Sequence, residues 1–281
     1  MTDAVLTAYL TRLGYAAPPS PALETLVDLH RRHLAQVPYD NLDIMLGRPP
    51  SVDPDLALAR VGEVGRAGYC FSQNGSFGRA LELLGFTVHR RRGFVDATPR
   101  GGALNHLVLF VDGLPTAANP GGRWWPDVGL GDGFLEPLPL MAGEYVEHGF
   151  RYRIDERPGD MWEFTHDPAG AFRGIEIGGA LESAELDASH AQLSTPPDGK
   201  FTQMLAVFRR TDAGTRMVRG ITASEVKSTA RTDTETTSYD EWRAALDGVG
   251  LPLDDVDDDE LRGLHARMIG VHLAWVEAGR P

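Results

Sequence analysis

The sequence changes character at Gly65-Arg66-Ala67-Gly68-Tyr69-Cys70-Phe71-Ser72-Gln73-Asn74, where a glycine-containing loop runs into a predicted helix. The apolar face of that helix continues through Phe77 and Leu81 to Leu84, and Gly85 is suited to end it. The pattern therefore places Cys70, the single cysteine of the sequence, at the start of a helix.

The chain on either side of this stretch has two different hydrophobic periods. Upstream, apolar residues recur at helical spacing, which predicts helices over residues 2–13, 23–34 and 54–60. Downstream, short apolar runs are separated by Gly, Pro and Asp, which predicts strands over residues 86–94, 104–111, 124–128, 145–154, 161–165 and 172–177. Successive strands without intervening helices favour an antiparallel sheet or barrel.

The last third has a mixed pattern. Residues 183–200 show no clear period, and residues 201–210 and 216–221 are predicted to form a hairpin pair. Helices are expected over residues 238–249 and 257–269, the second with acidic residues in its first turn.

Composition limits the class of protein. The 281 residues are 42% hydrophobic and 24% charged, as in folded globular proteins, and the net charge is −13. An acidic surface repels phosphate backbones and anionic lipid heads, so neither nucleic acid nor a membrane is expected as a partner. No apolar run approaches a membrane span, no basic leader is seen, and one cysteine forms no internal disulfide, so the expectation is a cytoplasmic protein.

Cys70 is a candidate nucleophile because of its position. Unpaired N–H groups and the helix dipole stabilise a thiolate at a helix N-terminus, and the same N–H groups suit the oxyanion of an attacked acyl group. The alternative is an inert core residue, since a lone cysteine is usually buried.

A thiolate nucleophile needs a base and an acceptor that orients it. His106 begins the apolar stretch Leu104–Val111 and is expected on a core strand, although a structural histidine bonded to a carbonyl fits as well. Asp127 lies among apolar residues, where an imidazole N–H would remove the cost of burying its charge. It also suits a turn that caps the following glycine-rich loop.

His30, His33, His265 and His272 are expected to be structural, with His30 and His33 partly exposed on their helix. The glycines at 129, 131 and 133 are not followed by a long helix and are no dinucleotide fingerprint. No metal site is predicted. The chain order Cys, His, Asp fits a nucleophile on a helix that faces two neighbouring strands.

Several ordered motifs resemble those of the arylamine N-acetyltransferases. Their nucleophile motif Arg-Gly-Gly-x-Cys-x-Glu-x-Asn is matched by Arg66, Gly68, Cys70 and Asn74. Their His-Leu-x-Leu strand and Asp-Val-Gly-Phe-Gly loop are similar to residues 106–109 and 127–131. Further similar segments are 10–15, 37–42 and 194–201, so the resemblance extends over most of the chain.

This resemblance implies an α+β fold with a cysteine-protease-like core. It consists of a helical domain over residues 1–88 that carries the nucleophile, an antiparallel β-barrel domain over 89–200 that carries His and Asp, and an α/β lid over 201–281. It also implies a catalytic triad of Cys70, His106 and Asp127.

The implied reaction is a ping-pong acyl transfer. The donor is acetyl-CoA or another acyl thioester, and the acceptor is a small arylamine-like nitrogen compound. Tyr69 and Phe71 flank the nucleophile and, with Gly129 and Leu130, are the candidate substrate contacts, although core packing suits both aromatic rings too.

The chain departs from the family pattern at Asp40, Ala67, Ser72, Leu130 and Gly199. Asp40 replaces a glutamate and is expected to pair with Arg66, which would hold the loop that presents Cys70. Ser72 replaces a glutamate, which leaves the substrate range less defined than the chemistry.

Three alternatives remain open at this point. An amide synthase of the same fold would take a larger acyl chain from an acyl carrier protein, a thiol hydrolase would release the acyl group to water, and a binding protein would have an unreactive Cys70. The basic clusters Arg90–Arg92 and Arg209–Arg210 are interpreted as solvated strand faces rather than CoA contacts.

Overall fold

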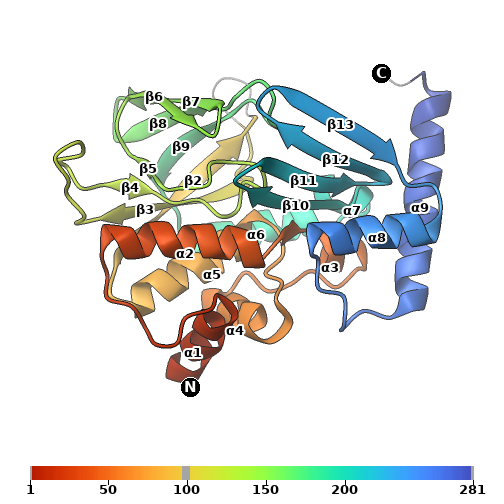
Figure 1. The fold of residues 1–281 in the computed structure, drawn as a ribbon, viewed down its shortest axis with the longest axis horizontal. Coiled ribbons are helices and arrows are strands. Elements are labelled where there is room, and N and C mark those ends of the chain that lie inside the picture. The colour runs from red at the N-terminus through yellow and green to blue at the C-terminus, as the bar shows by residue number, and fades with distance from the viewer. Residues whose placement is uncertain (1, 97–101, 280–281) are drawn as a thin grey trace.

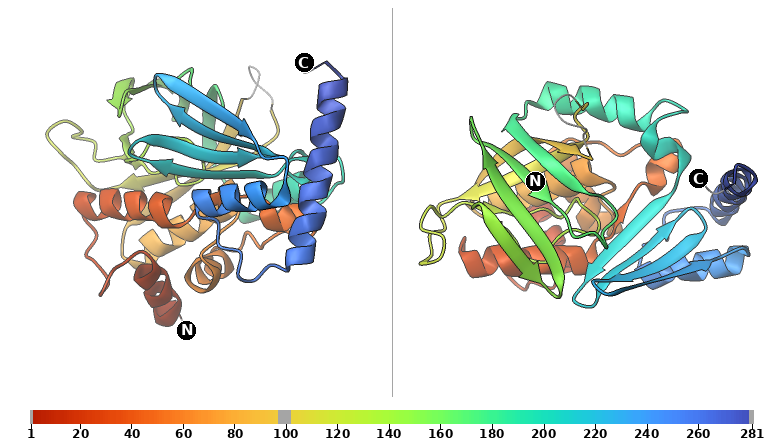
Figure 2. Two further views of the ribbon diagram at one scale, coloured as in Figure 1. Left: turned by 45° about the vertical axis from the view of Figure 1, so that its right-hand side comes forward. Right: turned by 90° about the horizontal axis from the view of Figure 1, so that it is seen from above.

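The computed structural model describes residues 2–96 and 102–279 and consists of a helical layer beneath two antiparallel sheets (Figures 1 and 2). The helices are α1 (Thr2–Arg12), α2 (Leu23–Gln36), α3 (Leu42–Met45), α4 (Pro54–Val64), α5 (Cys70–Leu83), α6 (Ser183–Ser194), α7 (Lys200–Gln203), α8 (Tyr239–Val249) and α9 (Asp258–Glu277). The strands are β1 (Tyr39–Asp40), β2 (Thr87–Val95), β3 (His106–Asp112), β4 (Trp124–Trp125), β5 (Leu138–Pro139), β6 (Gly143–Glu147), β7 (Phe150–Arg157), β8 (Met161–Thr165), β9 (Gly174–Ala180), β10 (Ala206–Thr211), β11 (Gly214–Arg219), β12 (Thr222–Lys227) and β13 (Ala230–Glu235).

The larger sheet has eight strands in the order β5-β4-β3-β2-β9-β8-β7-β6 and is curved like a barrel. Its inner face is aromatic: the rings of Trp125 and Phe164 lie 5.0 Å apart between centroids, and Phe134 packs on both. Alternate residues of β7 face inward, as the two-residue period of a strand requires. The predicted antiparallel barrel is therefore confirmed.

The smaller sheet has five strands in the order β1-β10-β11-β12-β13. Helix α8 covers one face of it, where Trp242 and Leu246 pack with Val207 and Val218. The expected hairpin forms as β10 and β11. Strands β12 and β13 were not predicted; every residue of β13 is exposed, and its polar sequence shows no hydrophobic alternation.

Two other predictions need correction. Residues 145–154 were expected as one strand, but they form the hairpin of β6 and β7. The chain turns at His148 and Gly149, whose φ angles are 49° and 85°, and a histidine gives little turn signal. The patternless segment after residue 183 contains α6, whose buried residues include Ser189 and Ser194, so it lacks an apolar stripe.

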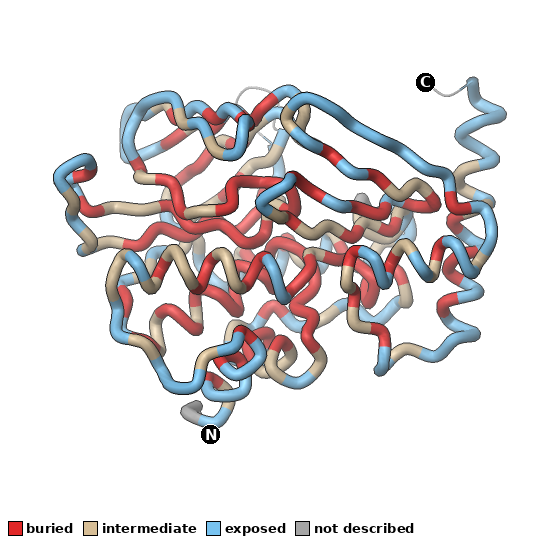
Figure 3. Tube along the Cα trace, in the orientation of Figure 1, coloured by how far each residue is buried: buried red, intermediate tan, exposed pale blue. Residues whose placement is uncertain are grey.

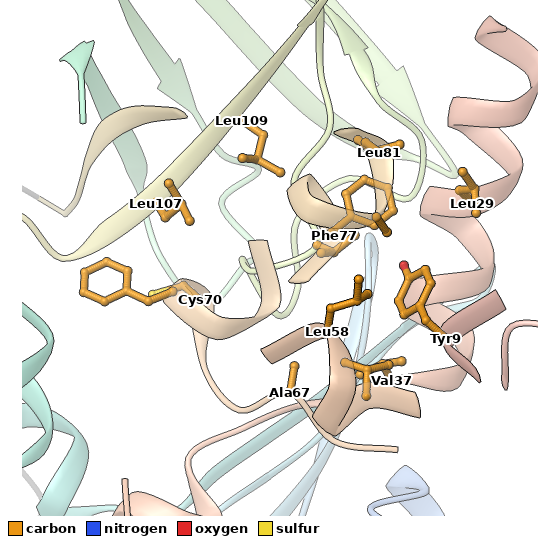
Figure 4. Packing of buried hydrophobic residues seen from close by; sticks show 14 of the residues in the cluster. Tyr9, Leu29, Val37, Leu58, Ala67, Cys70, Phe77, Leu81, Leu107 and Leu109 are labelled. Carbon is orange, nitrogen blue, oxygen red and sulfur yellow. The ribbon is translucent and has the colours of Figure 1, made fainter. Parts of the chain in front are cut away.

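The helices share a core with the other face of the larger sheet, opposite the aromatic inner face. Figure 4 shows Cys70, Phe77 and Leu81 of α5 near Leu107 and Leu109 of β3, and these residues belong to one buried cluster. Figure 3 shows α5 almost wholly buried beneath the sheets, as its residues confirm. Helix α5, which carries Cys70, is therefore a central element that packs directly against the strand carrying His106.

Strand β1 joins the helical layer to the smaller sheet. Tyr39 pairs with Phe208 of β10, and on its other side the Asp40 N–H donates to the Gly68 carbonyl at 3.1 Å. This short strand therefore fixes the loop before Cys70 to the five-stranded sheet. The division of the chain at residues 88 and 200 stays a prediction.

Candidate active site

Cys70 is the first residue of α5 and is 3% exposed. The residue before it, Tyr69, has extended backbone angles and provides no side-chain cap, which leaves the N–H groups of the first turn without that partner. The Cys70 thiol donates to the Asn105 carbonyl at 3.4 Å, directly before His106 in the chain. The structure therefore places the sulfur at a helix N-terminus and beside the start of β3.

His106 and Asp127 are joined by a hydrogen bond in the interior. The His106 Nε2–H donates to Asp127 Oδ2 at 2.8 Å, and both side chains are at most 2% exposed. This bond leaves Nδ1 as the ring nitrogen available to Cys70. The chain makes room for the histidine at Gly93 of β2, where a Cβ would lie 2.9 Å from that of His106.

The environment of His106 favours its charged form. Burial of the ring lowers the pKa of His106, but the Asp127 carboxylate, followed by the hydrogen bond to Cys70, outweighs burial and raises the pKa to about 10. A cysteine, a histidine and an aspartate are thus brought together in the order that the sequence suggested.

The Asp127 carboxylate accepts hydrogen bonds at both of its oxygens. Oδ2 also accepts from Trp125 Nε1 at 3.2 Å, and Oδ1 accepts from Asn74 Nδ2 at 2.7 Å and from the Gly129 N–H at 3.0 Å. These donors satisfy a buried charge that would otherwise be costly. Asp127 is therefore both the partner of His106 and the cap of the following loop, so its two interpretations hold together.

Asn74 connects the three segments of the site. One turn after Cys70 in α5, its amide also donates to the Leu107 carbonyl at 2.6 Å, and its oxygen accepts from the Val128 N–H at 2.9 Å. The backbone at Gly129 is equally close, because a Cβ there would lie 2.9 Å from the Cys70 Cα. Only glycine fits this approach of the aspartate loop to α5.

His30 was expected to be partly exposed, and this prediction was wrong. The ring is fully buried: Nδ1–H donates to the Leu135 carbonyl at 2.8 Å, and Nε2 accepts from the Asp127 N–H at 3.0 Å. His33 is buried too, between the Tyr9 hydroxyl and Gln73. The spacing of His30 with Leu26 and Leu34 placed it on the apolar face of α2, and that was the available signal.

Cys70 and His106 line a cavity of about 270 Å³. Gly129 and Leu130, two of the predicted substrate contacts, line it as well. The remaining wall comes from the aspartate loop, the end of β2, the residue before β3, the β8–β9 connection, the α7 segment and the smaller sheet, with the residues Tyr39, Val95, Asp96, Asn105, Asp132, Ala171, Phe172, Phe201, Met204, Ala206, Phe208 and Arg219.

Tyr69 and Phe71 do not line this cavity, contrary to their predicted role as substrate contacts. Both are fully buried, with ring centroids 5.2 Å apart, and the Tyr69 hydroxyl lies 2.7 Å from Nδ1 of His190 in α6. Core packing, the alternative given for them, accounts for both rings.

Arg66 does not pair with Asp40, contrary to expectation. Its guanidinium donates to both oxygens of Asp255, at 2.6 and 2.9 Å, and lies 3.5 Å from Asp43. Asp40 accepts from the Leu42 N–H at 2.9 Å instead, and burial raises the pKa of its carboxyl to about 6 against the opposing charge of Arg66. The loop before Cys70 is therefore tied to the segment between α8 and α9.

The basic clusters have structural partners. Arg90, Arg91 and Arg92 pair with Glu82, Asp160 and Glu185. Arg210 is buried and donates to the Gly133 carbonyl at 2.8 Å. In residues 2–96 and 102–279, no cluster of His, Cys, Asp and Glu suited to a metal is found, and no helix is long and apolar enough to cross a membrane.

The chain is similar to several known proteins. A model of the N-acetyltransferase family matches residues 22–255. The arylamine N-acetyltransferase of Mycolicibacterium smegmatis is 29% identical over 94% of this chain and 98% of that protein. The structure of Mycobacterium marinum arylamine N-acetyltransferase in complex with CoA matches with a TM-score of 0.81 at 26% identity, over 94% of this chain and 98% of that one.

A relative with a different name is also similar. Proansamycin X synthase of Amycolatopsis mediterranei is 28% identical over 53% of this chain and 57% of that protein. The family model spans most of the chain, and the similarity to the M. smegmatis protein extends over nearly all of it. The chain belongs to the arylamine N-acetyltransferase family.

Proposed function

We propose that the protein transfers an acetyl group from acetyl-CoA to the nitrogen of a small arylamine-like acceptor, through an acyl-cysteine at Cys70. The observation that carries this proposal is the shared cavity of Cys70 and His106, with Asp127 hydrogen-bonded behind the imidazole. The CoA bound to the M. marinum relative supports the donor.

The first half-reaction forms the acyl-enzyme. His106 accepts the thiol proton of Cys70, and Asp127 stabilises the imidazolium. The thiolate attacks the thioester carbonyl carbon, and N–H groups at the start of α5 stabilise the oxyanion. The carbon–sulfur bond of the donor breaks, and the leaving CoA thiolate takes the proton from His106. One thioester replaces another, so the step is close to balanced in free energy.

The second half-reaction consumes the acyl-cysteine. The unprotonated amine attacks the carbonyl carbon, His106 accepts a proton from the nitrogen, and the Cys70 thiolate leaves and is reprotonated. Amines of low basicity, such as anilines and hydrazides, are unprotonated at neutral pH and suit this step. Burial of the site keeps water from competing for the acyl group.

Intact-protein mass spectrometry tests the proposal directly. Incubation with acetyl-CoA alone should add the mass of one acetyl group to the wild-type protein and none to Cys70→Ala. An arylamine should then remove the adduct and yield the amide. An unmodified wild-type protein, or an adduct that persists in Cys70→Ala, would refute the mechanism.

An amide synthase is the second candidate, and the similarity to proansamycin X synthase favours it. Such an enzyme would accept a larger acyl chain from an acyl carrier protein. Acylation of Cys70 by a long-chain acyl thioester but not by acetyl-CoA would select this function. Release of free acid at equal rates with and without amine would instead indicate a thiol hydrolase. A cytoplasmic location stays a prediction.

A further inference from the structure

Arg219 is a cation in the wall of the catalytic cavity. Arg219 is the last residue of β11 and is exposed. Its side chain lines the same cavity as Cys70 and His106. Within the described ranges, its guanidinium makes no hydrogen bond or ion pair, in contrast to Arg90, Arg91 and Arg92. A free guanidinium at a reactive site in a chain of net charge −13 is suited to bind an anion.

The strand register shows which residues share a face of the smaller sheet with Arg219. Arg219 pairs with Ala206, Met217 with Phe208 and also with Ser224, so these five residues share one face of the smaller sheet. Phe208 lines the catalytic cavity, whereas Ser224 lines a second cavity of about 490 Å³ that ends at α9. Figure 1 shows α9 beside the ends of these strands. The two cavities thus lie along one face of the sheet.

Two side chains line both cavities, Arg219 and Met204. The other basic groups of the second cavity are already partnered, because Arg231 pairs with Asp233 at 2.8 Å and His272 lies 3.6 Å from Glu235. Among the described residues that line the two cavities, Arg219 is therefore the cation that lacks an anionic partner. It lies where the two cavities meet.

The size of the catalytic cavity determines which ligand extends as far as Arg219. About 270 Å³ holds a small aromatic amine but not a whole CoA molecule, so the donor must extend out of it. An acyl thioester whose long arm runs from Cys70 along the smaller sheet would pass Arg219 on the way into the second cavity. A compact acceptor has no need to pass this point.

We propose that Arg219 binds a phosphate of the acyl donor's phosphopantetheine arm, with the thioester at Cys70 and the arm directed along the smaller sheet. This inference rests on the proposed acyl transfer. A phosphate on this arm is common to CoA and to a carrier protein, so Arg219 serves either source.

The test compares donors that differ in phosphate. Initial rates of Cys70 acetylation are measured by mass spectrometry with acetyl-CoA, acetyl-4′-phosphopantetheine and acetyl-pantetheine, for wild type and Arg219→Gln. The variant should raise the apparent KM for acetyl-CoA about tenfold, because a charge-assisted hydrogen bond is lost, and leave acetyl-pantetheine unchanged. Arg219→Lys should recover part of the loss.

Arg216→Gln is the matched control. Arg216 is exposed on the opposite face of the same strand and pairs with Glu225 at 3.2 Å. The substitution therefore removes one charge from β11 without changing the lining of the two cavities. It should behave as wild type with all three donors. The amine concentration that gives half-maximal rate should also be unchanged in Arg219→Gln.

The outcomes separate the inference from the proposed function. A loss with acetyl-4′-phosphopantetheine as large as the loss with acetyl-CoA supports the inference, whereas a loss confined to acetyl-CoA places the contact at the nucleotide's phosphates and refutes it. An equal loss with acetyl-pantetheine, or no loss with any donor, refutes it while acyl transfer stands. A wild-type protein that no donor acetylates refutes both.

Discussion

The backbone N–H of Asp127 donates to Nε2 of His30, so a second buried imidazole anchors the residue that orients His106. His30 can accept this bond only while Nε2 is unprotonated, and its Nδ1–H is held by the Leu135 carbonyl. Burial lowers the pKa of His30 to about 4, which keeps the ring neutral. The position of the Asp127 backbone therefore depends on α2 as well as on its own loop.

His30→Phe should separate this anchoring from general stability. The change leaves the Asp127 N–H and the Leu135 carbonyl without partners, which costs about 2–3 kcal/mol of unfolding free energy. It should also slow alkylation of Cys70 by iodoacetamide, because the Asp127–His106 pair shifts. His33→Phe is the control, since it removes a buried imidazole from the same helix that contacts Tyr9 and Gln73 instead. Equal alkylation rates in the two variants would show that His30 is merely structural.

Acid should destabilise the fold through the same two histidines. Burial lowers the pKa of His30 and of His33 to about 4, whereas an unfolded chain binds these protons near pH 6.5. Their contribution is fully present above pH 6.5 and is lost as the pH falls toward 4, by roughly 3 kcal/mol for each ring. Urea unfolding between pH 7 and 4.5 measures the slope. His33→Phe should have a shallower slope than wild type, and an unchanged slope would contradict the assignment.

Asp127→Asn should lower the rate of Cys70 acylation by roughly a thousandfold or more, because the imidazolium loses its charge partner. Stopped-flow release of the CoA thiol measures the step. Asp112→Asn provides the comparison: Asp112 ends the strand that begins with His106, pairs with Arg123 at 3.0 Å and does not line the cavity. If both variants lose the same activity, Asp127 acts as a turn residue.

Asp255→Asn should loosen the loop that presents Cys70. Arg66 is fully buried and would lose its bidentate partner, which costs about 2 kcal/mol of unfolding free energy. Hydrogen exchange at residues 65–69 should become faster. Asp254→Asn removes the same charge from the exposed neighbouring residue and should leave exchange at wild-type rates. Unchanged exchange in Asp255→Asn would mean that Asp43 and the Pro252 carbonyl suffice to hold Arg66.

The sequence predicted the central features of the fold because they depend on local patterns. The helical period of α5, the apolar run of β3 and the order Cys70, His106, Asp127 are all visible in one dimension. Elements without an apolar period were missed, as in the exposed strand β13 and the polar face of α6. Here tertiary pairing, rather than the residues themselves, sets the structure.

The surroundings of the site were predicted less well than its central residues. The expected Arg66–Asp40 pair follows from family motifs that are close in sequence, but Asp255 lies far along the chain and has no motif of its own. Tyr69 and Phe71 are neighbours of Cys70 in sequence, yet the helix directs them into the core. The partners of a buried charge are fixed by long-range packing, which a single sequence does not display.

The pairing of β1 with β10 also has a consequence for folding during synthesis, because the two strands are far apart in the sequence. Cys70 leaves the ribosome long before Phe208, which pairs with Tyr39 of β1, and before Arg219. Contacts between such distant segments form late in folding. A nascent chain therefore carries the Cys70 thiol in an unfinished cavity until its last third, which supplies Phe208 and Arg219, has been translated.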